Sequence, residues 1–284
     1  MKTIKLVLEN VSYVYNPGTI YETVGITDAD LSFESEKSYA VIGHTGSGKS
    51  TLLQLMNGLL SPAKGRVLLD GEDVHAKKYK IKKLRSSVGL VFQYPEYQLF
   101  EETVIKDVCF GPKNLGYTPE ECMELAKEAL RLVGIEEDKF DQNPFNLSGG
   151  QKRRVAIAGV LAMNPGILVL DEPAAGLDPE GKEQILNLLK TLRETKKMGI
   201  VMVSHNMDDA SGADEVIVLD KGSIALKGSA REVFKEYERL TGLGLDVPFA
   251  MRMTRLLRGR GIALPDCFDN EELSKALLKE FKGR

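Results

Sequence analysis

The residues with the clearest chemical potential lie in one stretch, GHTGSGKST, between an apolar strand pattern (SYAVI) and a helical pattern (KSTLLQLMNGLL). A Gly-rich turn in this context lets backbone N–H groups converge on phosphate oxygens, and the helix N-terminus adds positive potential. Lys49 is predicted to bridge the β and γ phosphates, and the Ser50 hydroxyl to ligate Mg²⁺. The predicted phosphate-binding residues are Gly43, His44, Thr45, Gly46, Ser47, Gly48, Lys49, Ser50 and Thr51.

A carboxylate pair ends the stretch ILVLDEP, from Ile167 to Pro173. Its apolar residues predict a buried strand whose end delivers Asp171 toward the Mg²⁺ shell and Glu172 toward an attacking water. Taken alone, such a pair could instead cap a helix or form a surface turn.

A third element is LSGGQ, formed by Leu147, Ser148, Gly149, Gly150 and Gln151. Ser148 and Gln151 fit the S-x-x-Q capping box, so this stretch could simply begin the helix that follows. Capping does not need two glycines, which cost about 1 kcal/mol each inside a helix. A bare helix N-terminus is better explained as a second phosphate seat.

The composition is that of an ordinary globular protein, with 43% hydrophobic and 28% charged residues in 284. A formal net charge of -3 argues against a broad nucleic-acid-binding face, which needs clustered Lys and Arg. The three cysteines, Cys109, Cys122 and Cys267, are scattered, which predicts reduced thiols in a cytosolic protein.

The chain lacks the pattern of a secretory signal at its start, and its longest apolar run, VAIAGVLAM, is far short of the roughly 20 residues that span a bilayer. Any membrane role is therefore expected to depend on a partner.

The order of strand and helix patterns predicts an α/β fold. Strand patterns dominate up to Asp70 and predict an antiparallel or mixed sheet, and helical patterns fill much of 102–164. GILVLDEP, GIVMVSH and ADEVIVLD then predict parallel strands, with a crossover helix between the first two. After Gly228 the chain is predicted to be helical, which suggests a small C-terminal module.

One chain does not need two phosphate seats for one nucleotide, and here the ordered motifs resemble those of ABC-type ATPases over roughly residues 3–228. The resemblance implies an ABC ATPase fold and head-to-tail pairing, in which the LSGGQ of one subunit closes on the ATP of the other. It also implies roles for four further residues: Tyr15 (or, less well placed, Tyr13) stacks on adenine, Gln93 senses Mg²⁺ and the attacking water, Asp178 communicates across the dimer, and His205 contacts the γ-phosphate. Catalysis would then involve Glu172, His205, Gln93 and Lys49, with Ser50, Gln93 and Asp171 around Mg²⁺.

The chain resembles most the A′-type ATPase subunits of energy-coupling factor (ECF) transporters, which drive uptake of vitamins and transition-metal ions. The similar residues are GHTGSGKST, FEETV, the insertion YNPGTIYE and the run from NPFNLSGGQ to LVLDEP. This resemblance implies a homologous A-type subunit as partner, with a homodimer possible for the isolated chain. It also implies a membrane T subunit, an indirectly bound S subunit and a peripheral location on the cytoplasmic face of the membrane. We expect an ABC nucleotide-binding domain at 1–228, with a helical subdomain at about 94–165, and a C-terminal helical module at 229–284.

The stretch from Tyr94 to Val104 follows Gln93 and is the expected dock for the T subunit. Glu96, Glu101 and Glu102 would complement a basic coupling helix, and Tyr94, Tyr97, Leu99 and Phe100 would supply apolar contact. The alternative is a solvated helix start, because carboxylates suit a first helical turn.

Two other functions stay open at this point: the ATPase of a binding-protein-dependent importer, and an ABC ATPase without a transporter. Two small departures from the ABC pattern, Ala174 before AGLD and Ser204 before the switch histidine, remove no catalytic group. The short chain between Gln93 and Leu147 has no sustained heptads, which argues against a chromosome or repair role.

Overall fold

The computed structural model describes residues 3–282, which form two compact units. The first unit lies within Met1–Ser38 and Ser50–Met202, and the second within Tyr39–Lys49 and Val203–Arg284. Each unit has its own buried apolar cluster. The two units are described separately below.

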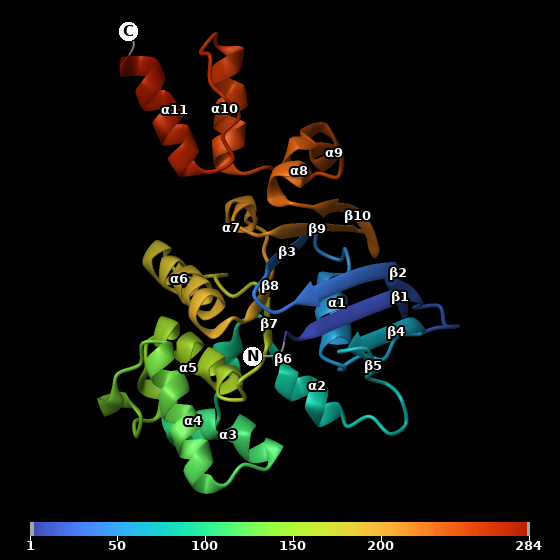
Figure 1. Cartoon of the computed structure of the whole chain (residues 1–284), viewed down its shortest axis with the longest axis vertical. Coiled ribbons are helices and arrows are strands. Elements are labelled where there is room, and N and C mark those ends of the chain that lie inside the picture. Colours follow the sequence, from blue (N-terminus) through green and yellow to red (C-terminus); the bar gives the residue numbers. More distant parts are fainter. Residues whose placement is uncertain (1–2, 283–284) are drawn as a thin grey trace. The chain divides into compact units, whose positions relative to one another are not determined.

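An antiparallel sheet opens the first unit. Its strands are β1 (Lys5–Tyr15), β2 (Thr23–Glu34), β4 (Lys64–Leu69) and β5 (Glu72–Asp73), in the order β2-β1-β4-β5. Alternate residues of β1, including Leu6 and Leu8, are fully buried, as the period of two requires for a half-buried strand. The helix α1 (Lys49–Met56) lies beside this sheet (Figure 1) and buries Leu52, Leu53 and Leu55.

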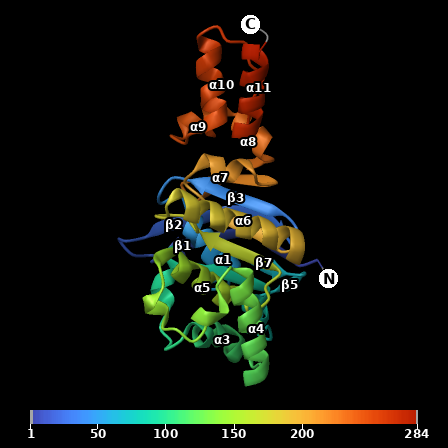
Figure 2. The same cartoon turned by 90° about the vertical axis from the view of Figure 1, so that its left-hand side faces the viewer.

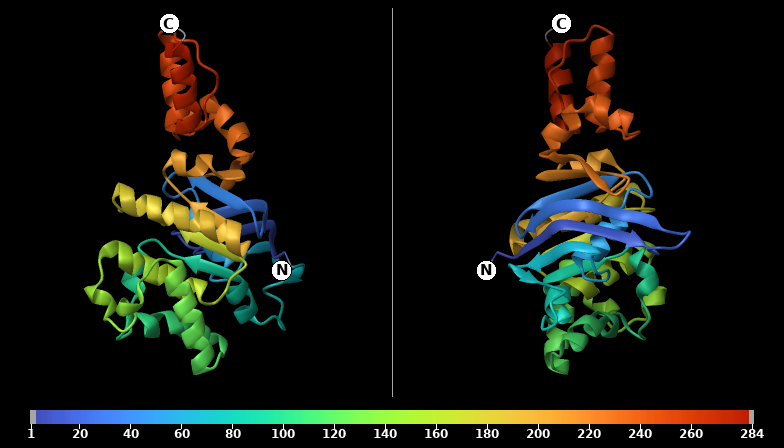
Figure 3. Two further views of the ribbon diagram at one scale, coloured as in Figure 1. Left: turned by 60° about the vertical axis from the view of Figure 1, so that its left-hand side comes forward. Right: turned by 90° about the vertical axis from the view of Figure 1, so that its right-hand side faces the viewer.

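Three strands of the first unit follow in the order β8-β7-β6: β6 (Val88–Val91), β7 (Ile167–Asp171) and β8 (Gly199–Val203). β6 and β7 pair in parallel, and α2 (Ile81–Ser87) leads into β6. The helix α6 (Pro179–Lys196) connects β7 to β8 and lies along the strands in Figure 3. It buries Ile185, Leu188, Leu189 and Leu192 against β7, because these residues share one face at helical spacing.

The helical part of the first unit follows β6 and precedes β7 in the chain, and it is drawn in green in Figure 1. Its elements are η1 (Pro95–Gln98), α3 (Val104–Leu115), α4 (Pro119–Leu132), η2 (Glu137–Lys139), η3 (Pro144–Asn146) and α5 (Gly149–Leu161). Local signals explain where α4 begins: Thr118 and Glu121 form a capping box, and Pro119 occupies the first turn, where no N–H is needed. Gly116 closes α3 in the left-handed conformation, with φ +98°.

The second unit is built on β3 (Ser38–Gly43), β9 (Glu215–Asp220) and β10 (Ser223–Gly228). β3 and β9 are parallel, and β9 and β10 are antiparallel. Three short helices, α7 (Met207–Ser211), α8 (Ala230–Lys235) and α9 (Tyr237–Gly242), share an apolar core with these strands. The core includes Ile42 of β3, Val218 of β9 and Phe234 of α8.

A helical hairpin completes the second unit, formed by α10 (Phe249–Gly259) and α11 (Asn270–Lys282), which lie side by side in Figure 2. A small cluster of Ala250, Leu264, Cys267 and Leu273 holds the hairpin together. Leu256, Leu278 and Phe281 point away from this cluster and are at least half exposed.

The predicted α/β fold is confirmed: antiparallel strands come first, helices fill the middle, parallel strands follow and helices end the chain. All three cysteines are free thiols. Between residues 3 and 282 no helix combines the length and the hydropathy that crossing a bilayer would require.

Candidate functional site

The predicted phosphate-binding turn lies at the end of β3, between Gly43 and the start of α1. Gly46 and Gly48 have φ values of +79° and +105°, a region that other residues enter only with strain. At Gly46 a Cβ atom would meet no heavy atom within 4 Å, so this side of the turn is open. The turn thus has the left-handed glycines and the open side that a phosphate-binding loop requires.

Lys49 is 93% buried and its ammonium group is held by the turn itself. Its Nζ donates to the carbonyl oxygens of Gly43 at 2.7 Å and His44 at 2.6 Å. A buried charge needs such partners, and the ammonium group has three donors. The lysine is thereby fixed over the loop that it is predicted to serve.

The Ser50 hydroxyl donates to Oδ2 of Asp171 at 2.9 Å, within the first unit. Ser50 lies in the first turn of α1 and Asp171 ends β7, so two elements far apart in the sequence bring their oxygens together. Two of the three residues predicted around Mg²⁺, Ser50 and Asp171, are thus adjacent.

A second hydrogen bond at the end of β7 joins the predicted sensor to the predicted base. Nε2 of Gln93 donates to Oε2 of Glu172 at 3.0 Å. Glu172 has φ +49°, an unusual value for a residue with a long side chain. Such strain persists only where the surroundings hold it, and it is common at active sites.

Tyr15 rather than Tyr13 contacts α1. The Tyr15 hydroxyl lies 3.0 Å from Oγ1 of Thr51, and the two tyrosine rings meet edge to face at 4.9 Å. This contact favours Tyr15 as the base-stacking residue.

The sequence did not point to Gly25, which lies in β2 below both rings. A Cβ atom there would come within 2.9 Å of Thr51 Cγ2 and 3.0 Å of Tyr15 Cε2. The register of β1 and β2 shifts beside it, a strand irregularity that often accompanies glycine. Gly25 therefore makes room for the contact between Tyr15 and Thr51.

LSGGQ begins α5, and the capping box predicted from its sequence is present. Ser148 and Gln151 form the capping box, with Gln151 N donating to Ser148 Oγ and Ser148 N to Gln151 Oε1. Gly149 and Gly150 have nothing within 4 Å of an added Cβ, so the helix start is open. Leu147 was expected to bind the nucleotide, but its side chain is 94% buried in the helical core and instead anchors the motif.

The remaining predicted residues lie at element ends. Asp178 caps α6 by accepting a hydrogen bond from Gly181 N at 2.8 Å. His205 is exposed and follows β8. His44, expected to face the nucleotide, donates through Nε2 to the Leu243 carbonyl in the turn after α9, so any phosphate contact of this residue falls to its backbone.

Two residues of the expected dock are not open to a partner as predicted. Leu99 is 95% buried in the helical core, because the turn after η1 points it inward. Both carboxylate oxygens of Glu96 are bonded to Arg153, a buried residue of α5 that the motifs did not single out. Arg153 shares the i, i+4, i+8 spacing with buried Ile157 and Leu161, which is the one sequence signal for its burial.

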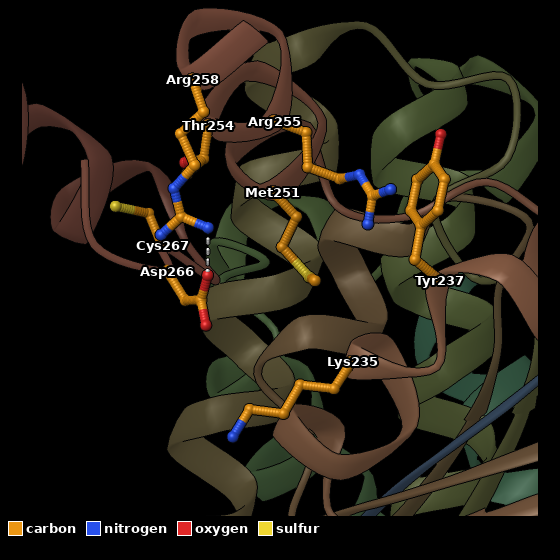
Figure 4. A pocket seen from close by; sticks show the side chains of 8 residues that line it. All are labelled: Lys235, Tyr237, Met251, Thr254, Arg255, Arg258, Asp266 and Cys267. Atoms are coloured by element: carbon orange, nitrogen blue, oxygen red, sulfur yellow. Dashed lines mark hydrogen bonds and ion pairs between the residues drawn. The ribbon is translucent and has the colours of Figure 1, made fainter. Parts of the chain in front are cut away.

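The cavity in Figure 4 belongs to the C-terminal helices and contains none of the motif residues. Its volume is about 220 Å³, and charged residues at its mouth are already paired: Arg258 bonds Asp266 and Arg255 bonds Glu238. Its lining residues are Lys235, Tyr237, Met251, Thr254, Arg255, Arg258, Asp266 and Cys267. This cavity is not the nucleotide site.

Residues 26–175 match the family model described as ABC transporter. The chain is 54% identical over 278 residues to the energy-coupling factor transporter ATP-binding protein EcfA2 of Caldanaerobacter subterraneus subsp. tengcongensis, covering 97% of each chain. It also resembles the structure of cbiO1 from Clostridium perfringens, described as part of the ABC transporter complex cbiONQ, with TM-score 0.74, 38% identity and coverage of 89% of this chain and 98% of that one. The dimeric bacterial ABC transporter cassette MJ0796 gives TM-score 0.69, 29% identity and coverage of 80% and 99%.

Fold, motifs and matches together define an ABC-type ATPase. The chain belongs to the EcfA2 family, the ATP-binding subunits of energy-coupling factor transporters. The predicted A′ type and the predicted enzyme class are thereby confirmed.

The position of Gly25 leads to a test of the base-stacking assignment. Gly25→Ala is expected to displace Tyr15 and to weaken nucleotide binding about tenfold, which corresponds to about 1.4 kcal/mol of lost stacking. Titration with a fluorescent ADP analogue measures the change. Gly159→Ala, at a helical position with open space around an added Cβ, is the matched control; equal affinities for the two variants would refute the role of Gly25.

Proposed function

We propose that this ATPase binds ATP and Mg²⁺ through the phosphate-binding turn, Tyr15, Gln93 and Asp171, and that Glu172 is its general base. The contact between Ser50 and Asp171 carries the proposal, because it unites the two motif ends that the reaction needs. Lys49 directly precedes Ser50 in the chain, so we include it among the nucleotide-binding residues. His205 is assigned to the γ-phosphate from its order among the motifs.

The residues around Asp171 fit a magnesium ion. Mg²⁺ prefers oxygen ligands and usually takes only one or two from protein, with water and phosphate filling the rest. Ser50 Oγ and Asp171 Oδ2 are two such oxygens at 2.9 Å from each other, and Gln93 lies beside them through its bond to Glu172. The bound ion would neutralise charge on the phosphates.

Glu172 is placed to accept a proton from the attacking water. Gln93 donates to Oε2 of Glu172 at 3.0 Å, which helps to fix the direction of this carboxylate. The strained backbone at Glu172 supports a fixed direction for this carboxylate.

The open start of α5 is proposed as the seat for the γ-phosphate of ATP held by a partner subunit. Gly149 and Gly150 leave backbone N–H groups accessible, and the capping box leaves the helix stable without covering them. A homologous A-type ATPase is the proposed partner, and Asp178 is assigned to communication across that pair. We also assign residues 1–228, including a helical subdomain at about 94–165, to the ABC domain, and 229–284 to a module that adds contact between the two ATPases.

The proposed dock for the membrane T subunit is an aromatic and acidic patch, here called the docking patch: Tyr94, Tyr97, Phe100, Glu101 and Glu102. Tyr97 is 84% exposed and Phe100 57%, values that are unusual for large apolar side chains. Glu101 and Glu102 precede Thr103, the N-cap of α3, so they do not belong to a first helical turn as the alternative required. Through the T subunit the chain would act at the cytoplasmic face of the membrane, with an S subunit binding the substrate.

The general-base role leads to the first test of the proposed function. Glu172→Gln is expected to bind MgATP with unchanged affinity but to lower turnover by roughly 10²- to 10⁴-fold, the usual contribution of a general base. Steady-state phosphate release and equilibrium nucleotide binding are the two measurements. Near-normal hydrolysis by this variant would refute the assignment of Glu172 as general base.

The docking patch leads to a second test. Reversing Glu101 and Glu102 to Lys is expected to reduce co-purification with the T subunit several-fold, because a basic partner surface would meet like charge. ATP hydrolysis by the isolated ATPase pair should not change. Reversal of Glu124 and Glu128, exposed on α4, is the control for net charge; equal assembly of both double variants would remove the dock from this surface.

A further inference from the structure

Arg153 joins three segments of the first unit that the motifs had left separate. It lies in α5, two residues after LSGGQ, and is 98% buried. Its Nε and Nη2 donate to the two oxygens of Glu96 at 3.0 and 2.6 Å. Its Nη1 donates to the carbonyl oxygens of Pro173 at 3.2 Å and Ala175 at 2.6 Å.

Each end of this network lies next to a functional residue. Glu96 belongs to η1, three residues after Gln93 and within the stretch that also carries the docking patch. Pro173 directly follows Glu172, and Ala175 begins AGLD, which ends at Asp178. The guanidinium group therefore links the segment after Gln93 to the turn that contains the proposed base.

The geometry of this link is specific to arginine. The planar guanidinium presents five donors in a fixed fork, four of which are used here, whereas an ammonium group cannot span both the carboxylate and the two carbonyls. Burial alone would raise the pKa of Glu96, but the hydrogen bonds and charge of Arg153 outweigh it and hold the pKa below its usual value. Removing either partner would leave the other buried without its hydrogen bonds, so the two side chains depend on each other.

Strained backbone lies at both ends of the link. Tyr94, whose ring lies 5.7 Å from the guanidinium carbon, has φ +53°, and Glu172 has φ +49°. Non-glycine residues hold such conformations only when their surroundings enforce them. The bond from Gln93 to Glu172 closes the same loop of contacts. These contacts couple η1 to the turn after Glu172.

We propose that Arg153 is a positioning residue that transmits docking of the membrane subunit at the docking patch to the turn from Glu172 to Asp178. This inference rests on the proposed dock. A partner that displaces η1 moves Glu96, Arg153 follows its two bonds to that carboxylate, and the carbonyls of Pro173 and Ala175 follow the guanidinium. Hydrolysis thereby responds to the state of the membrane partner.

The test is amide hydrogen exchange of the full chain, in its pair with the A-type subunit, with and without the T subunit. In the wild type, docking should slow exchange of amides in 94–102 and change exchange at 174–178 by about threefold, which corresponds to about 0.65 kcal/mol of local opening. In Arg153→Lys, protection at 94–102 should remain while the change at 174–178 is lost.

A second variant distinguishes loss of coupling between the dock and the turn from loss of protein stability. Replacing a buried ion pair by apolar residues of similar size is often neutral for stability, so Glu96→Met combined with Arg153→Met should retain the wild-type melting temperature more closely than either single change. Its exchange at 174–178 should nevertheless stay insensitive to docking. Arg131→Gln, which breaks the exposed pair of Arg131 and Glu137, is the control and should respond as the wild type does.

The outcomes are distinguishable. Wild-type docking that protects 94–102 but leaves 174–178 unchanged overturns the inference, as does an unaltered response in folded Arg153 variants. Absence of protection at 94–102 in an assembled wild-type complex overturns the proposed dock, and the inference falls with it.

Discussion

The hydrogen bond from Ser50 to Asp171 is the contact on which the rest of the site depends. Ser50 lies in the first turn of α1 and Asp171 is the last residue of β7, so the contact joins two elements that are far apart in the sequence. Parallel strands deliver their carboxyl ends to one edge of a sheet, and the parallel pair β6 and β7 brings Gln93 and Glu172 together in this way.

Around that contact, several polar side chains hydrogen-bond to one another. Gln93 holds Glu172, Arg153 holds the two carbonyls that follow it, and Glu96 neutralises Arg153. Arg153 is the buried member of these contacts, and a buried polar group is stable only when its partners satisfy it, so a change at Glu96 affects Arg153 directly. This property makes the network suited to linking a surface that binds a partner with a turn that performs chemistry.

The sequence predicted well those features that local rules determine. Ser148 caps its helix as the S-x-x-Q spacing indicates, and strand patterns located β3, β7 and β8. The predicted adjacency of Ser50 and Asp171 followed from two motifs with known context, and the structure confirms it.

Features that depend on which face of an element packs inward were not predictable in this way. Leu99 and Leu147 were expected to contact partners or nucleotide, but an apolar residue beside a motif can equally enter the core, and both do so. Arg153 and Glu96 read as surface charges until α5 and η1 are packed together. The role of Gly25 depends on two side chains that approach it from other elements, which no local pattern records.

The central claim is that this chain provides a phosphate seat for ATP held by its partner. The most direct measurement is single-turnover hydrolysis by the pair with the A-type subunit, with Glu172→Gln in this chain so that the remaining hydrolysis comes from ATP on the partner. Adding Gly149→Asp places a negative charge in the open helix start, where it repels phosphate but suits the helix N-terminus. We predict that Gly149→Asp abolishes the remaining hydrolysis while Gly149→Ala retains most of it; equal hydrolysis by both variants would contradict the claim.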